Sequence, residues 1–95
     1  MSGFEIRGHD LYDAHHRKIA TARGQAIYDG NDQRIAVIRG DDLYDTEERR
    51  MATLRGSDIY DAESMKVGSL SDVQDSIKGA AVGVMDVAFW YCFVR

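Results

Sequence analysis

The sequence predicts a mainly β domain of four β-hairpin repeats, followed by a hydrophobic segment that does not repeat. A motif with a period of 16 residues recurs four times between residues 7 and 70. Ile, Val, Thr and Tyr alternate with other residues inside each copy, which favours strands over helices. The whole length of 95 residues supports one hydrophobic core, so we predict a single domain over residues 1–95.

Each repeat begins with an Arg-Gly pair and contains Tyr-Asp preceded by Leu or Ile. A base, an apolar residue and a small residue follow after four variable positions, as in LYDAHHRKIA, IYDGNDQRIA, LYDTEERRMA and IYDAESMKVG. Sixteen residues are too few for two helices but suffice for one hairpin. The predicted repeats are therefore 7–22, 23–38, 39–54 and 55–70, with Phe4–Ile6 as the end of a preceding half unit, so that repeat structure covers 4–70.

Two kinds of turn are expected to alternate along the repeats. The glycine of each Arg-Gly pair supplies the positive φ of a tight hairpin turn. The aspartate of each Tyr-Asp pair accepts hydrogen bonds from backbone N–H groups ahead of it; these residues are Asp13, Asp29, Asp45 and Asp61. A four-residue loop after Asp13 would pair it with Lys18 and pair Leu11 with Ala20. An acid then faces a base in every repeat.

This register sorts the side chains onto two different faces. One face is aliphatic and carries Ile6, Leu11, Ala20, Ala22, Ile27, Ala36, Ile38, Leu43, Ala52, Leu54, Ile59, Gly68 and Leu70. The opposite face is amphipathic and carries Tyr12, Ile19, Thr21, Tyr28, Ile35, Val37, Tyr44, Met51, Thr53, Tyr60, Val67 and Ser69. The recurring Ala or Gly suits hairpins that converge on a crowded axis. We therefore favour a small barrel-like or flower-like ring of roughly fourfold symmetry, with an open, strongly curved sheet as the alternative.

The unit YDAHHRKIA, joined to its neighbours by spacers such as RGDDLYD, resembles a known repeat pattern. Tandem YDxxGxx(I/V)(G/A) hairpins of this kind occur in small uncharacterised bacterial proteins described as β-flowers. The likeness covers about 64 of 95 residues, and His16, Asp32, Glu48 and Ser64 stand where the pattern has glycine. The resemblance implies a flower-like β-sheet in a bacterial protein and implies no particular activity.

After Leu70 the repeat stops, and residues 71–95 form a hydrophobic C-terminal segment. Ser71 with Gln74 three residues later is typical of a capping box. A short helix is expected there, with its apolar face formed by Val73, Ile77, Ala80, Ala81, Val84 and Ala88. The run VAFWYCFV at 87–94 is typical of a buried strand, so helix and strand remain alternatives for 80–94.

The same segment bears on membrane insertion and on assembly. Residues 80–94 are interrupted by Asp86 and fall short of the roughly 20 apolar residues of a membrane-spanning helix, so no span is predicted. An exposed run this apolar would aggregate, so we expect it to cover the amphipathic face or to bind a second copy of the chain. The predicted partner is therefore another subunit, and the predicted oligomer interface consists of Phe89, Trp90, Tyr91 and Phe93.

Charge and cysteine content narrow the functional classes. The net charge of −4 provides no positive field for nucleic acid or for an anionic membrane. The lone Cys92 cannot form an internal disulfide, and no secretory signal is apparent, so a cytoplasmic location is expected.

Catalysis receives no support from the repeats. An active site is normally one group of unlike residues, whereas the repeats are copies of one turn. Three histidines in the first unit, His9, His15 and His16, are able in principle to bind a metal together with Asp10 or Asp13, as in a metalloenzyme, but they occupy variable turn positions. We therefore predict no catalytic residues, no cofactor and no metal site.

Three functional hypotheses remain from different classes, and the histidine-dependent metalloenzyme is the last of them in order of support. The first is a noncatalytic structural or protein-interaction module that self-assembles through its C-terminal segment. The alternative is a small-ligand-binding module whose tyrosine-lined face stacks a planar ligand, using Tyr12, Tyr28, Tyr44 and Tyr60.

Overall fold

The computed structural model describes residues 3–80 and 83–94 and is built on one ten-stranded sheet. The sheet order is β10-β1-β2-β3-β4-β5-β6-β7-β8-β9, and every neighbouring pair is antiparallel except the parallel pair β1–β10. The strands are β1 (Phe4–Arg7), β2 (Asp10–Tyr12), β3 (Lys18–Arg23), β4 (Ala26–Asp29), β5 (Arg34–Arg39), β6 (Asp42–Tyr44), β7 (Arg50–Arg55), β8 (Asp58–Asp61), β9 (Lys66–Ser69) and β10 (Ile77–Lys78). The predicted mainly β meander of hairpins is confirmed.

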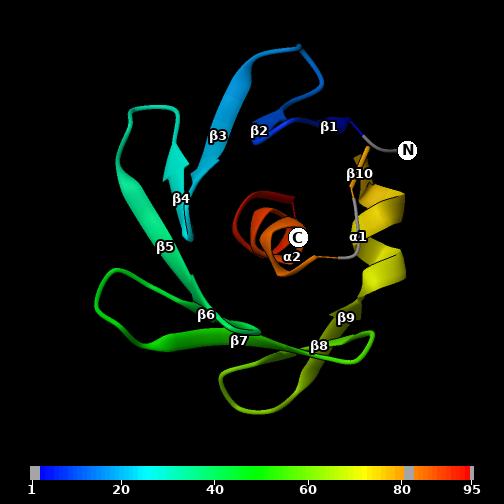
Figure 1. The fold of residues 1–95 in the computed structure, drawn as a ribbon. Coiled ribbons are helices and arrows are strands. Elements are labelled where there is room, and N and C mark those ends of the chain that lie inside the picture. The colour runs from blue at the N-terminus through cyan, green and yellow to red at the C-terminus, as the bar shows by residue number, and fades with distance from the viewer. Residues whose placement is uncertain (1–2, 81–82, 95) are drawn as a thin grey trace.

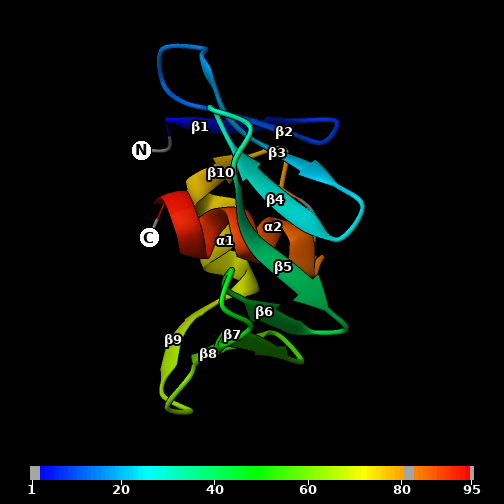
Figure 2. The same ribbon diagram turned by 90° about the vertical axis from the view of Figure 1, so that its left-hand side faces the viewer.

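The sheet curls around the centre of the molecule without closing on itself (Figures 1 and 2). Its two edges are β9 and β10, and the helix α1 (Leu70–Ser76) runs between them. Val73 of α1 and Ile77 of β10 are completely buried at this junction. The closed ring that we preferred is therefore not formed, and the alternative, an open and strongly curved sheet, describes the structure.

The Arg-Gly turns have the predicted tight geometry. Arg7 pairs with Asp10, so only two residues form the loop, and the equivalent residues pair in the other three repeats. The first loop residue is the glycine in each case, with φ between 60° and 62°. This is the residue that a two-residue hairpin turn of the mirror-image type II requires to be glycine.

The Tyr-Asp turns are shorter than predicted. The N–H of Asp13 donates to the carbonyl of Arg17, and the N–H of His16 donates to the carbonyl of Asp13, which leaves a three-residue loop. The carboxylate oxygen Oδ1 of Asp13 accepts from the N–H groups of His15 at 2.8 Å and Arg17 at 3.0 Å, confirming the predicted aspartate turn. The other three turns repeat this set of bonds.

A β-bulge in each repeat explains why the pairing beyond the bulge was predicted correctly in spite of the loop length. Leu11 pairs with Ala20 as expected, but Tyr12 pairs with Lys18, which leaves Ile19 as an extra residue. The predicted pairings of Tyr12 with Ile19 and Asp13 with Lys18 are therefore wrong. A three-residue loop followed by one extra bulged residue gives the same strand pairing beyond the bulge as a four-residue loop without a bulge.

The bulge also changes which side the extra residue faces. The bulged residues Ile19, Ile35, Met51 and Val67 were assigned to the amphipathic face, yet all four pack against the core. Their aliphatic neighbours point inward as predicted, and Leu11, Ile27, Leu43 and Ile59 are almost completely buried.

The C-terminal segment fills the space that the sheet surrounds. Residues 84–89 form the helix α2 (Val84–Phe89), which continues as one π-helical turn, η1 (Trp90–Val94), at the centre of Figure 1. Of the two alternatives left open for 80–94, the helix is the correct one over 84–94, and this helix lies inside the curled sheet instead of on its amphipathic face. A predominantly apolar helix is stable where the core surrounds it. The curled sheet supplies those surroundings, because Val87, Ala88, Phe89 and Trp90 are buried.

The first helix begins two residues earlier than predicted. Ser69 is its N-cap: its side chain accepts from the backbone N–H of Asp72, and the Asp72 side chain accepts from the backbone N–H of Ser69. The predicted cap, Ser71, lies inside α1. The expected continuous helical face is also interrupted, because Ile77 and Lys78 pair with β1 as a strand. Ala81, which was expected on that face, lies outside the described residues.

Candidate functional site

The four repeat tyrosines form four separate units, each made of one tyrosine and one arginine. The guanidinium carbon of Arg7 lies 4.9 Å from the ring centre of Tyr12, and the corresponding distances are 5.0 Å for Arg23–Tyr28, 5.2 Å for Arg39–Tyr44 and 5.5 Å for Arg55–Tyr60. These are cation–π contacts. The arginine that begins each repeat thus covers the tyrosine of the same repeat.

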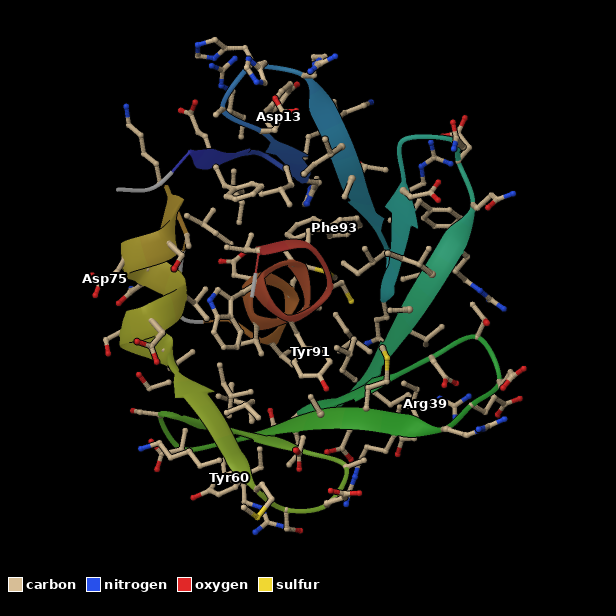
Figure 3. The ribbon with its side chains drawn as sticks, turned by 180° about the vertical axis from the view of Figure 1, so that it is seen from behind. Asp13, Arg39, Tyr60, Asp75, Tyr91 and Phe93 are labelled. Carbon is tan, nitrogen blue, oxygen red and sulfur yellow. The ribbon has the colours of Figure 1, made fainter. Side chains whose placement is uncertain are left out.

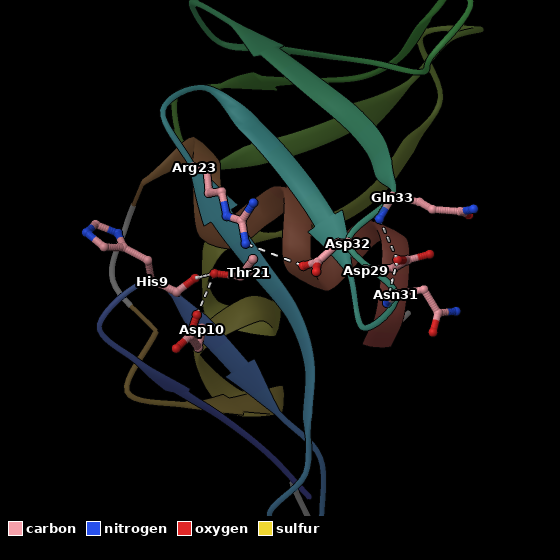
Figure 4. A network of polar contacts seen from close by, with 8 residues as sticks. All are labelled: His9, Asp10, Thr21, Arg23, Asp29, Asn31, Asp32 and Gln33. Carbon is pink, nitrogen blue, oxygen red and sulfur yellow. Dashed lines mark hydrogen bonds and ion pairs between the residues drawn. The ribbon is translucent and has the colours of Figure 1, made fainter.

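Two of these units are extended by an acid from the following turn. Arg23 lies 3.4 Å from Oδ1 of Asp32, and Arg39 lies 3.3 Å from Oε1 of Glu48. Figure 4 shows the Arg23 contact beside the Asp29 turn, and it also shows Thr21 donating to Asp10 and to the carbonyl of His9. Exposed pairs of this kind contribute about 0.2–1 kcal/mol each, so they position side chains more than they stabilise the fold.

The tyrosines are not brought together into one binding site. They lie on the face opposite the aliphatic core residues, and Figure 3 places Tyr60 at the periphery, well away from the central helix. The interior of the curled sheet is occupied by α2 and η1. A single tyrosine-lined pocket, as the ligand-binding hypothesis requires, is therefore not formed by Tyr12, Tyr28, Tyr44 and Tyr60 within the chain.

The four aromatic residues assigned to an oligomer interface divide into two pairs. Phe89 is 1% exposed and Trp90 is 6% exposed, so both belong to the core of their own chain and are not accessible to a partner in this structure. Tyr91 and Phe93 are partly buried and belong to η1. Figure 3 shows both beside the central helix at the end of the molecule where η1 lies.

A pocket of about 370 Å³ lies where β1, the first Tyr-Asp turn and β10 meet. Five of the residues that line it carry charge or an aromatic ring: Phe4, Glu5, Asp13, His16 and Lys78. Asp13 and His16 were considered from the sequence as possible metal ligands, whereas Phe4, Glu5 and Lys78 were not predicted as site residues. The available signal was the interruption of the repeat, because Phe4, Glu5 and Lys78 lie outside the four complete units.

Both carboxylates of this pocket are held in the ionised form. The hydrogen bond from Arg7 to Oε1 of Glu5, 3.1 Å long, lowers the pKa of Glu5 below its ordinary value, against the raising effect of desolvation. The backbone N–H of Arg17 is the main cause of the lowered pKa of Asp13, and desolvation again opposes it. Lys78 faces Glu5 across the β1–β10 pair and lowers the pKa of Glu5 further.

Residues 3–80 and 83–94 contain neither a cluster of metal-ligating side chains nor a helix that could cross a membrane. Those residues contain no group of three or more His, Cys, Asp or Glu side chains placed to hold a metal ion. Their helices are all too short or too polar to cross a bilayer.

Comparison of the chain with protein-family models, with curated proteins and with solved structures found no match.

Proposed function

We propose that this protein is a noncatalytic structural module that assembles with copies of itself or with other proteins. The observation that carries the proposal is the filled interior: the chain's own helix α2 occupies the space that the curled sheet surrounds. The outer face repeats one Arg–Tyr unit four times instead of gathering unlike residues around one reacting atom.

The proposed relationship to the β-flower proteins is consistent with the backbone of the Tyr-Asp turns. His16, Asp32, Glu48 and Ser64 stand at the glycine position of that pattern, and all four have φ of 64° or 65°. Glycine adopts this left-handed conformation with the least strain. The relationship supports a structural role and implies no chemistry.

The proposed contact surface is the end of the molecule where η1 lies. Tyr91 and Phe93 are partly exposed there, and aromatic residues are enriched in protein interfaces. Phe89 and Trp90 support this surface from inside the core and are not part of the contact.

The test is the solution mass measured by light scattering after size exclusion. We expect a defined oligomer for the natural chain and a folded monomer for the double variant Tyr91→Ser, Phe93→Ser. The control is Met65→Ser, which alters the exposed Met65 and should leave the mass unchanged. A natural chain that is monomeric at every concentration would exclude self-assembly, and capture experiments with Tyr91 and Phe93 variants would then decide on other partners.

A further inference from the structure

We propose that the pocket between β1, the first Tyr-Asp turn and β10 binds a small zwitterion that carries an ammonium group and a carboxylate, as an amino acid does. This inference goes beyond the proposed assembly role and does not depend on it. The pocket lies on the first hairpin, where β10 adds to the edge of the repeat array, and it involves none of the C-terminal aromatic residues.

At this pocket the first repeat has neighbours that the other three repeats lack. The later Tyr-Asp turns are each flanked by strands of neighbouring repeats, whereas the first turn meets Glu5 of β1 and Lys78 of β10. It therefore gathers unlike groups: two carboxylates, one amine, one imidazole and one aromatic ring. Small-molecule sites are concave, and a few polar or charged groups in them orient the ligand.

The two carboxylates are preorganised to accept an ammonium group. Oε1 of Glu5 is engaged by Arg7, and Oδ1 of Asp13 is engaged by two backbone N–H groups. Within the described part of the chain, Oε2 of Glu5 makes no hydrogen bond, and the nearest cation to Oδ2 of Asp13 is Arg17 at 3.8 Å. Each carboxylate is thus oriented through one oxygen while the second retains accepting capacity. An ammonium group has three donors and is able to bridge two such oxygens.

The positive charge of Lys78 favours a carboxylate as the second charged group of the ligand. Lys78 is exposed and forms no ion pair with any described carboxylate within 4.0 Å, although its charge acts on Glu5. His16 also lines the pocket from the turn side. A simple cation would meet repulsion from Lys78, and a simple anion would meet repulsion from Glu5 and Asp13. A ligand with both charges satisfies both sides.

The dimensions and the rim fit a ligand of amino-acid size. A volume of about 370 Å³ lies at the lower end of the usual range for small-molecule sites. Gly3 forms part of the rim, and a Cβ at this residue would lie 2.8 Å from Cβ of Ala14. Any side chain at residue 3 would therefore push against the turn that carries Asp13.

The test uses leucine and two analogues that each lack one charged group. Leucine, isoamylamine (no carboxylate) and 4-methylpentanoate (no amine) are titrated into the ¹⁵N-labelled full chain at neutral pH. We expect leucine to shift the amide signals of Glu5, Asp13, His16 and Lys78, with each analogue binding at least about tenfold weaker, the ratio that corresponds to about 1.4 kcal/mol. Signals of the equivalent third turn, residues 45–49, serve as the internal control.

Two substitutions complete the test. Lys78→Gln should weaken leucine binding about tenfold while leaving isoamylamine binding unchanged or stronger. Lys66→Gln is the matched control, because Lys66 is an exposed strand lysine already paired with Asp58 at 3.2 Å. The proposal is overturned if leucine causes no shift at its solubility limit, if it shifts all four turns equally, or if isoamylamine binds the natural chain as tightly as leucine does. None of these outcomes bears on the oligomer mass, so the proposed assembly stands or falls separately.

Discussion

The repeats and the C-terminal segment acquire their conformations in different ways. In the repeats the same aspartate bonds recur in four turns, with N–H to Oδ1 distances of 2.8–3.0 Å, so the local residues determine the local backbone. The run VAFWYCFV has the aromatic and β-branched composition of a strand and is nevertheless helical. Its conformation is imposed by the curled sheet around it. Residues close in sequence therefore determine the turns of the sheet, whereas the helical conformation of the C-terminal segment depends on the sheet that surrounds it.

Removal of α2 and η1 should have the largest effect on the stability of the fold. A chain that ends at Gly79 leaves the aliphatic face around Leu11, Ile27 and Leu43 without its central partner, because α2 packs inside the sheet. We expect this truncated chain to lose cooperative unfolding and dispersed amide signals, as measured by thermal circular dichroism and NMR. A truncated chain that folds as a stable monomer would show that the sheet does not need α2.

Alanine should destabilise the fourth repeat at a position where the other three repeats already have alanine. Ala20, Ala36 and Ala52 occupy the position of Gly68, but a Cβ on Gly68 would lie 2.5 Å from Cη2 of Trp90. We expect Gly68→Ala to lower the free energy of unfolding by about 1–3 kcal/mol in urea denaturation, as overpacking does.

Trp90→Phe provides the matched control for this contact, because it removes the ring atoms that the new methyl group would meet. In that background Gly68→Ala should cost much less, giving a clear coupling energy in a double-mutant cycle. Equal costs in both backgrounds would mean that Trp90 is not what requires glycine at this position.

Within the repeats, a gain in stability is expected from one turn residue. Ser64 has φ of 65°, and within residues 3–80 and 83–94 its side chain makes no hydrogen bond. Asp32 and Glu48 differ, because their side chains pair with arginines. Ser64→Gly should raise the free energy of unfolding by about 1 kcal/mol, because glycine adopts the left-handed conformation without strain. Ser64→Ala is the control and should give no gain.

The smallest effect should be the pH dependence that Asp13 contributes. Its pKa is lower in the folded chain than in the unfolded chain, so the folded state favours the carboxylate. The stabilisation is fully present above the unfolded value of about 3.9 and is lost as the pH falls through the lowered folded value. Urea midpoints measured from about pH 5 down to about pH 2 should therefore fall less steeply for Asp13→Asn than for the natural chain. Identical slopes would contradict this contribution.

Alternation and turn residues were sufficient to predict the hairpins, the aspartate turns and the inward face apart from the four bulged residues. The exact loop was not predictable, because a three-residue loop followed by a bulge at Ile19 places Leu11 opposite Ala20 just as a four-residue loop does. Two different backbones thus produce one hydrophobic pattern. The fate of Phe89 and Trp90 was missed because an apolar run alone does not distinguish a buried strand from a buried helix.

The candidate pocket was less accessible to sequence reasoning than the fold. Asp13 and His16 were visible as turn residues, but their neighbour Lys78 is brought in by β10, a strand of two residues. So short a strand leaves no alternating pattern, and its parallel pairing with β1 depends on where α1 ends. The pocket is therefore formed by residues that the fold brings together and not by a motif that is visible in the sequence.

The parallel pairing of β1 with β10 has a consequence for the order in which the molecule is completed. It joins residue 4 to residue 77, and α2 follows later still in the chain. During synthesis the hairpins are able to form one after another as they emerge, but the first strand keeps an unpaired edge, and the aliphatic face stays uncovered, until the last part of the chain arrives. A nascent chain stalled before α2 is therefore expected to be a ready substrate for chaperones and proteases, although most of its sheet has already been made.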